Sequence, residues 1–151
     1  MHIFFLDWEI LEIDILEQIK MELTKQDKEL INKAKLMVNK KKIYSGELKA
    51  VGCALITKKG KLFTGANWDL FCGVGFCAES SAISNMVSHS DETEIKTIVA
   101  CSKHHIMPPC GRCREVMALL DKKNLENTEV IISDTEKVKL KELIPFDWRE
   151  K

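Results

Sequence analysis

The chain has 151 residues, of which 45% are apolar and 30% charged, a length and composition typical of a single globular domain. Its 23 Lys and Arg residues balance its 23 Asp and Glu residues, and this balance argues against a nucleic-acid-binding protein. No apolar run approaches the roughly 20 residues of a membrane span, and the first residues lack the basic start and cleavage site of a secretory signal. We therefore expect a cytoplasmic protein without a polynucleotide or membrane partner.

Residues 1–20 differ in pattern from the rest, because acidic residues interrupt their apolar positions throughout. They can form an extra helix on the body or on a partner, a frayed arm, or a misassigned start, in which case Met21 is the first residue. We treat residues 1–20 as an N-terminal extension of open role and residues 21–151 as one domain.

The domain is predicted to begin with a helix over residues 24–41. Thr24 and Asp27 have the spacing of a capping box, with Asp in place of Glu, and apolar residues then recur at helical intervals. The elements expected next are a turn (44–46), a hairpin of two strands (50–57 and 61–66) and a loop that contains two glycines (67–76).

The second half alternates helices and strands. The expected elements are a helix (77–89), a strand (94–101), a loop (102–109), a helix that begins near residue 110, a strand (128–133) and a short closing segment (140–148). Such alternation implies a sheet with helices on its faces. Because the first strands form an antiparallel hairpin and the later connections pass through helices, we predict a three-layer α/β/α domain with a mixed sheet of about five strands.

Two short stretches carry the chemistry, and each lies at the expected start of a helix. They are Cys77-Ala78-Glu79 and Pro109-Cys110-Gly111-Arg112-Cys113. A Cys-x-x-Cys pair places two sulfurs one helical turn apart, and a cysteine from a second helix makes three ligands. Three protein ligands with one open position are typical of catalytic zinc, whereas four are typical of structural zinc. We predict one Zn²⁺ per chain, held by Cys77, Cys110 and Cys113.

Glu79 is the candidate for proton transfer. Zinc lowers the pKa of its bound water to about 7, and the hydroxide chemistry that follows needs a group that moves protons. Glu79 lies two residues after Cys77, so it is close to the metal without being forced to bind it. Its carboxylate can accept the water proton and protonate first a ring nitrogen and then departing ammonia. A His or Cys ligand, a Glu and a later Pro-Cys-x-x-Cys form the signature of zinc deaminases.

With these motifs the chain resembles the cytidine deaminase superfamily over roughly residues 24–148, and its cysteine as first ligand is similar to the branch that acts on free nucleosides. The resemblance implies removal of the amino group of cytidine or deoxycytidine with release of ammonia. It also implies a homo-oligomer, commonly a tetramer. A blasticidin-S-like nucleoside or another aminated heterocycle is the alternative substrate.

The resemblance further implies substrate contacts. Asn67 and Asp69 stand where cytidine deaminases carry an Asn-x-Glu that contacts the ribose, although Asp is shorter by one methylene. In blasticidin-S deaminases the acid is missing and Thr-Gly-x-Asn is kept; the loop before the first zinc ligand has a length between the two patterns. Further candidates are Ala78, Pro108, whose carbonyl would accept the substrate amino group, and Phe146. In relatives an aromatic residue from this last region reaches a neighbouring subunit's site; core packing is the alternative for Phe146.

Two departures from the family affect charge and selectivity. Three thiolates on one zinc leave a net charge of −1, which a nearby cation should offset. Cytidine deaminases place an Arg directly after Cys-Ala-Glu, where this chain has Ser80, whereas its Arg112 lies inside Cys-Gly-Arg-Cys, as in blasticidin-S deaminases. We expect Arg112 to offset the charge, with Arg114 as a second candidate. The aromatic residue that often stacks on the base is absent just before Val51, which leaves base selectivity open.

The other cysteines and the histidine pair have simpler interpretations. Cys53 and Cys101 fall inside apolar strands, as core residues do. Cys72 lies in the glycine-containing loop, where a role as fourth ligand would close the site. His104 and His105 are expected in a solvated loop, with a contact at the pocket mouth as the alternative.

Two other classes of function compete with the deaminase. One is a non-catalytic zinc-binding module used for assembly, and the other is a thiol redox protein that uses Cys110 and Cys113. A Glu79→Gln change would abolish deamination and leave the redox protein unaffected, and bound zinc would count against the redox protein.

Overall fold

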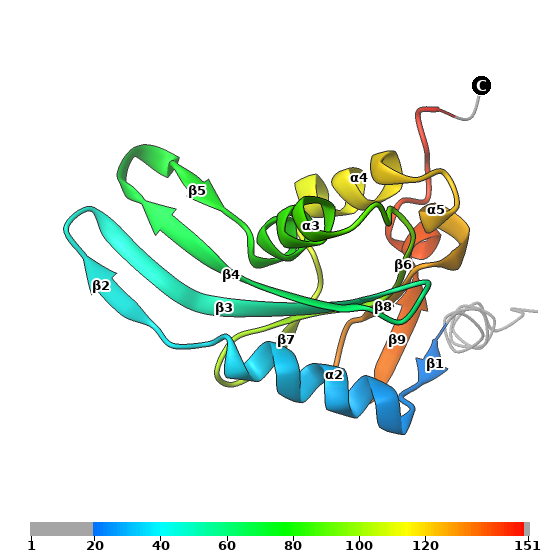
Figure 1. Cartoon of the computed structure of the whole chain (residues 1–151), viewed down its shortest axis with the longest axis horizontal. Coiled ribbons are helices and arrows are strands. Elements are labelled where there is room, and N and C mark those ends of the chain that lie inside the picture. The colour runs from blue at the N-terminus through cyan, green and yellow to red at the C-terminus, as the bar shows by residue number, and fades with distance from the viewer. Residues whose placement is uncertain (1–19, 150–151) are drawn as a thin grey trace, which may run out of the picture.

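The computed structural model describes residues 20–149, which form one sheet with helices on both faces (Figure 1). The strands are β1 (Met21–Glu22), β2 (Lys41–Ile43), β3 (Gly46–Thr57), β4 (Leu62–Leu70), β5 (Gly75–Phe76), β6 (Ile95–Cys101), β7 (Ile106–Met107), β8 (Glu129–Ile131) and β9 (Glu136–Lys139). The helices are α2 (Lys25–Leu36), α3 (Ala78–His89), α4 (Gly111–Leu120) and α5 (Asn124–Asn127), with 3₁₀ turns η1 (Phe71–Gly73) and η2 (Leu140–Leu143). The extension over residues 1–19 lies outside the described residues.

The sheet confirms the predicted class but is larger than predicted. Its strand order is β1-β9-β8-β6-β3-β4-β5, with β2 beside β3 and β7 beside β6, so the described part has nine strands instead of about five. Strands β6 and β8 pair in parallel and the other pairs are antiparallel, which makes the sheet mixed as expected. The additional strands have two to four residues each, too few for a period-two pattern to be recognised in the sequence.

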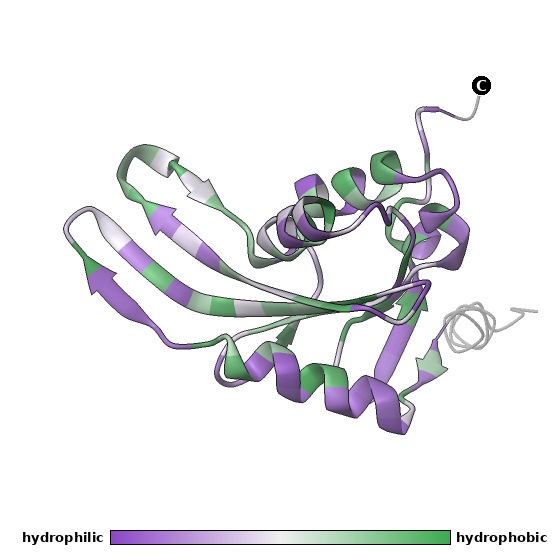
Figure 2. Ribbon diagram, viewed as in Figure 1, coloured by the Kyte–Doolittle hydropathy of each residue, from purple (hydrophilic) through white to green (hydrophobic). Residues whose placement is uncertain are grey.

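Two apolar clusters fill the spaces between the three layers. Helix α2 covers one face of the sheet, and α3 and α4 cover the other (Figure 1). One cluster lies under α2 and contains Leu30, Ile31 and Ala34, while the larger one includes Ala82 and Met86 of α3. In Figure 2 helix α2 is mainly hydrophilic with a narrower hydrophobic stripe, as expected for a helix that buries one side only.

Helix α2 begins as predicted and ends earlier. The Thr24 hydroxyl accepts a hydrogen bond from the Asp27 backbone N–H, and the Asp27 carboxylate accepts one from the Thr24 N–H, so the capping box is confirmed. The helix ends at Leu36 instead of residue 41, because the lysine-rich residues 41–43 pair with β3 as an edge strand.

The segment predicted as a loop over residues 67–76 is mostly strand. Strand β4 continues to Leu70, turns through η1 and returns as β5, and together with β2 and β3 it forms an arm that projects beyond the end of α2 (Figure 1). Loop prediction was wrong here because the two glycines lie in the turn and in the short return strand. This hairpin leads the chain directly into the first candidate zinc ligand.

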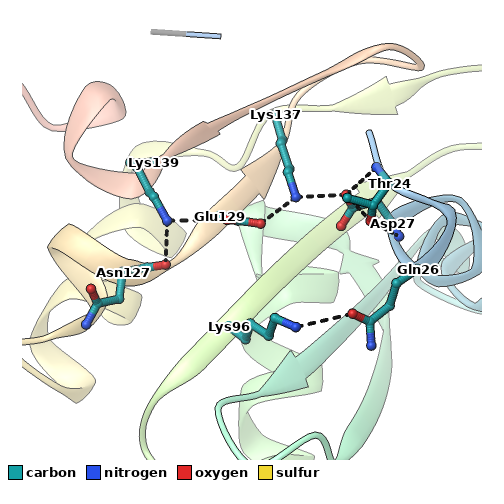
Figure 3. Close-up of polar contacts among 8 residues, drawn as sticks. All are labelled: Thr24, Gln26, Asp27, Lys96, Asn127, Glu129, Lys137 and Lys139. Carbon is teal, nitrogen blue, oxygen red and sulfur yellow. Dashed lines mark hydrogen bonds and ion pairs between the residues drawn. The ribbon is translucent and has the colours of Figure 1, made fainter. Parts of the chain in front are cut away.

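At the other end of the sheet, a buried lysine joins three elements. The Lys137 ammonium on β9 lies 2.8 Å from an Asp27 carboxylate oxygen on α2 and 2.5 Å from one of Glu129 on β8 (Figure 3). We call Asp27, Glu129 and Lys137 the ion-pair cluster. No helix in the part of the chain that the structure describes is long and apolar enough to cross a membrane.

Candidate metal centre and active site

Three cysteine sulfurs converge between α3 and α4. Cys77 is the N-cap of α3, Cys110 is the N-cap of α4 and Cys113 lies in the first turn of α4. Their sulfurs all lie within 4.8 Å of one another, and those of Cys77 and Cys110 are 3.7 Å apart. Two thiolates bound to tetrahedral zinc at about 2.3 Å lie about 3.8 Å apart, so the spacing fits one zinc ion.

Close contact between α3 and the sheet sets the position of the first ligand. At Gly65 of β4, a Cβ atom would lie 2.3 Å from the backbone nitrogen of Ala82 and 2.7 Å from the carbonyl oxygen of Ala78. Only glycine allows the helix to approach this strand so closely. The N-terminus of α3 is thereby held against β4, beside the start of α4.

The three thiols differ in their environment. Burial raises the pKa of the Cys113 thiol well above its ordinary value, and burial also raises the pKa of Cys77. For Cys110, burial acts in the same direction, but hydrogen bonds from the backbone and thiol of Cys113 outweigh it and lower the pKa. Because metal binding replaces these protons, we expect zinc binding to release protons and to weaken as the pH falls.

Glu79 lies beside this sulfur cluster without belonging to it. It occupies the first turn of α3, its exposed fraction is 6%, and burial raises the pKa of its carboxyl group. A carboxyl group with a raised pKa is suited to accept and return a proton near neutral pH. Its position therefore agrees with the predicted proton-transfer role.

One pocket of about 370 Å³ brings the predicted residues together. It is lined by Val51, Asn67, Trp68, Asp69, Gly73, Gly75, Phe76, Cys77, Ala78, Glu79, Ala100, Met107, Pro108 and Cys110. The pocket thus contains two zinc ligands, Glu79 and four of the five predicted substrate contacts. The fifth, Phe146, is 93% exposed and does not line this pocket, so a contact with a neighbouring subunit's site stays a prediction.

Asn67 also has a local structural role. Its side-chain oxygen accepts a hydrogen bond of 2.7 Å from the backbone N–H of Val51, at the bulge where the register between β3 and β4 shifts. Because the oxygen is committed to the backbone, the amide nitrogen is the group left to donate to a ligand. Asp69 lies two residues further along the same strand and therefore on the same face.

The residues next to the sulfurs differ from the sequence expectation. The Arg112 guanidinium lies over the Phe76 ring, 5.2 Å from its centre, and within residues 20–149 no hydrogen bond joins it to a cluster sulfur. Instead, the Ser80 hydroxyl lies 3.5 Å from the Cys113 sulfur. No sequence pattern predicts this contact, because Ser80 differs from the family only in standing where an arginine is expected.

Arg114 supports the loop that carries the second zinc ligand. Its guanidinium donates to the Pro109 carbonyl at 2.8 Å and to the Leu143 carbonyl at 3.2 Å, so it joins the start of α4 to η2. The first of these bonds holds Pro109, the residue immediately before Cys110. Sequence reasoning considered Arg114 only as a charge near the metal and missed this backbone contact.

The remaining sequence interpretations agree with the structure. Cys53 and Cys101 are fully buried in the two cores, and Cys72 is exposed in η1 and outside the sulfur cluster. His104 and His105 lie exposed in the loop between β6 and β7 and are not part of the pocket lining. In the described residues, the sulfur cluster is the only group found that could hold a metal ion.

Known proteins resemble this chain in sequence and in fold. Residues 24–126 match the family model described as the cytidine and deoxycytidylate deaminase zinc-binding region. A cytidine deaminase from Halalkalibacterium halodurans is 33% identical over 100 residues, which cover 63% of this chain and 74% of that protein. The crystal structure of cytidine deaminase from Mycobacterium tuberculosis is similar with a TM-score of 0.68 and 20% identity, over 83% of this chain and 98% of that one. The crystal structure of cytidine deaminase from Burkholderia pseudomallei is similar with a TM-score of 0.62 and 28% identity, over 83% of this chain and 100% of that one.

Proposed function

This chain belongs to the family of cytidine and deoxycytidylate deaminases with a zinc-binding region, and from that premise we propose that it converts free cytidine or deoxycytidine to the corresponding uridine and ammonia. It is a zinc-dependent hydrolytic deaminase with one zinc per chain. The observation that carries the proposal is a buried carboxylate, Glu79, in one pocket with Cys77 and Cys110 of the sulfur cluster.

The catalytic role falls to Glu79. When bound by Cys77, Cys110 and Cys113, zinc supplies a Lewis acid that makes water a nucleophile near neutral pH. Glu79 would accept one proton from the attacking water and deliver it to the ring nitrogen next to the amino-bearing carbon. It would then take the remaining proton from the hydroxyl group formed at that carbon and transfer it to the departing amino group. One water is consumed and one ammonia is released for each nucleoside.

The pocket walls orient the nucleoside. The amide nitrogen of Asn67 and the carboxylate of Asp69 share one face of β4, where they can bind the hydroxyl groups of a sugar. Pro108 and Ala78 also line the pocket. We assign to the Pro108 carbonyl the hydrogen bond from the amino group that leaves, and to Ala78 a contact with the base. Proline retains this acceptor, since it lacks only the backbone N–H.

The charges of the pocket favour a nucleoside over a nucleotide. Its lining, within the described chain, includes the carboxylates of Asp69 and Glu79 and no Lys, Arg or His side chain. A 5′-phosphate would enter a negatively charged pocket without a cation to pair with it. We expect cytidine to have a kcat/KM at least tenfold above that of its 5′-monophosphate.

The proposal also covers the cellular location, the oligomeric state and the role of Arg112. We place the enzyme in the cytoplasm, where its free thiols stay reduced, and as a homotetramer in which Phe146 reaches a neighbouring site. Arg112, between Cys110 and Cys113 in the sequence, adds a positive charge that solvent screens, and within residues 20–149 it makes no hydrogen bond to a cluster sulfur.

The experiment is an ammonia-release assay on the zinc-loaded protein. The panel contains cytidine, deoxycytidine, cytidine monophosphate, blasticidin S and an aminated purine. Turnover of the two nucleosides supports the proposal, and turnover of blasticidin S alone would assign the chain to the alternative substrate. No turnover across the panel, with one zinc per chain present, would contradict a deaminase and favour a non-catalytic zinc-binding module.

A further inference from the structure

The zinc site of this chain concentrates negative charge in a partly buried place. Three thiolates and one Zn²⁺ carry a net charge of −1, and the carboxylate of Glu79 adds a second negative charge nearby. Cys113 is 0% exposed and Glu79 is 6% exposed, so water can do little to stabilise these charges. A buried anionic sulfur needs a hydrogen-bond donor from the protein.

Ser80 supplies such a donor to the most buried of the three sulfurs. Its hydroxyl oxygen lies 3.5 Å from the Cys113 sulfur, within the range of hydrogen bonds to sulfur, and Ser80 is only 5% exposed. A zinc-bound thiolate carries no proton, so the hydroxyl must be the donor and the sulfur the acceptor. Because Ser80 lies on α3 and Cys113 on α4, the bond also links the two helices that carry the metal ligands.

Arg112 does not take this place. Its side chain is exposed and its guanidinium lies against the Phe76 ring. Solvent screens the charge of an exposed guanidinium. The contact with the Phe76 ring also keeps the guanidinium away from the cluster sulfurs. The direct contact with the anionic cluster thus comes from a neutral hydroxyl.

We propose that Ser80 is a positioning residue of the zinc site, which holds Cys113 in its metal-binding orientation and stabilises its thiolate through the hydroxyl hydrogen bond. The inference rests on the proposed function only in so far as the three cysteines bind zinc. It assigns to a serine the stabilisation that the sequence motif suggested for Arg112.

The first test measures zinc affinity by chelator competition on the full chain, without substrate. Ser80→Ala should bind zinc roughly 10 to 100-fold more weakly than the wild type, as expected when a hydrogen bond to a metal ligand is lost. Ser81→Ala is the matched control, because it removes the neighbouring hydroxyl of the same helix, which contacts no cluster sulfur in the described residues. Ser80→Thr keeps the hydroxyl and should retain most of the affinity.

The second test reads the sulfur directly in cobalt-substituted protein. Loss of a donor to Cys113 raises the energy of the sulfur lone pairs, so the sulfur-to-cobalt charge-transfer band of Ser80→Ala should move to lower energy. The bands of Ser81→Ala and Arg112→Gln should stay close to the wild-type position.

The outcomes are separable from those of the activity assay. Wild-type zinc affinity and an unshifted cobalt band in Ser80→Ala would overturn the inference, and so would equal losses in Ser80→Ala and Ser80→Thr. A larger band shift in Arg112→Gln than in Ser80→Ala would return the role to the arginine. All of these results are obtained without a substrate, so they hold whether or not cytidine is turned over.

Discussion

Two polar clusters lie in different parts of the molecule and serve different purposes. The sulfur cluster of Cys77, Cys110 and Cys113 lies between α3 and α4 and lines a pocket in part. The ion-pair cluster lies where α2, β8 and β9 meet (Figure 3). In the ion-pair cluster the lysine is matched by carboxylates of the same chain, whereas the sulfur cluster offers three ligands to an ion from outside. Internal pairing stabilises a fold, and unmatched ligands create a binding site.

Removing a ligand from the sulfur cluster should have the largest effect on zinc binding and activity. Cys113→Ala should remove zinc binding and all deaminase activity, because two ligands at two helix ends cannot hold a catalytic zinc. It should also abolish the stabilisation that zinc gives the fold, roughly 4 kcal/mol at a free zinc concentration of about 1,000 times Kd. Metal analysis and thermal unfolding with and without zinc measure both effects.

Cys101→Ala provides the control for that variant. Cys101 is as fully buried as Cys113 but lies in β6, outside the sulfur cluster. It should keep one zinc per chain and lose only the packing of its side chain. Zinc retained by Cys113→Ala, or lost by Cys101→Ala, would contradict the assignment of the ligands.

Breaking the ion-pair cluster should act on stability and leave the chemistry intact. Lys137→Met leaves the buried Asp27 carboxylate without its cation, whereas Glu129 keeps its pair with Lys139. Removing one partner of a buried ion pair costs about 3–5 kcal/mol. Activity per folded molecule and zinc content should not change. Urea titration measures the free energy of unfolding of this variant and of its control, Lys141→Met. The control removes an exposed ion pair with Glu126 and should cost less than about 1 kcal/mol. Equal losses in the two variants would show that burial of the cluster contributes nothing.

The free energy of unfolding should depend on pH through the shifted pKa values of Asp27 and Lys137 in the ion-pair cluster. Despite burial, which acts in the opposite direction, hydrogen bonding to Lys137 lowers the pKa of Asp27 below its ordinary 3.8. Burial lowers the pKa of Lys137, but its hydrogen bonds to Asp27 and Glu129 outweigh burial and raise the pKa above its ordinary 10.5.

These shifts define where the stabilisation is present. The Asp27 contribution is complete above pH 3.8 and is lost as the pH falls through the lower pKa of the folded state. The Lys137 contribution is complete below pH 10.5 and is lost as the pH rises through the higher folded value. The stability difference between wild type and Lys137→Met should therefore be constant from about pH 5 to pH 9 and shrink in acid. A difference that grows below pH 4 would contradict this account.

The two clusters also show what the sequence can and cannot predict. The cysteines and Glu79 lie in two short motifs at helix starts, and local spacing was enough to find them. Lys137 and Asp27 are 110 residues apart, and their contact depends on β9, a strand of four residues that no local pattern revealed. The same limit applies to Ser80 and Cys113, because only the packing of α3 beside α4 brings them together.

A moderate effect on both stability and zinc binding is expected at Arg114. Arg114 bonds to backbone carbonyls of Pro109 and Leu143, so it supports the zinc site through the chain and contacts no ligand atom itself. Arg114→Gln should lower stability by about 1–2 kcal/mol, the loss of charged hydrogen bonds, and lower zinc affinity by less than Ser80→Ala does. Thermal unfolding and chelator competition measure the two losses; a zinc affinity as low as that of Cys113→Ala would show that Arg114 acts on the metal directly.

Glu79, the carboxylate beside the sulfur cluster, is proposed to move the protons of the reaction. The most direct test of this role is the cytidine turnover of Glu79→Gln with zinc content measured in the same sample. Glutamine keeps the shape of the side chain and cannot accept the water proton, so kcat should fall by about 10²–10⁴-fold while one zinc per chain remains. Turnover close to wild type in the zinc-loaded variant would contradict the claim.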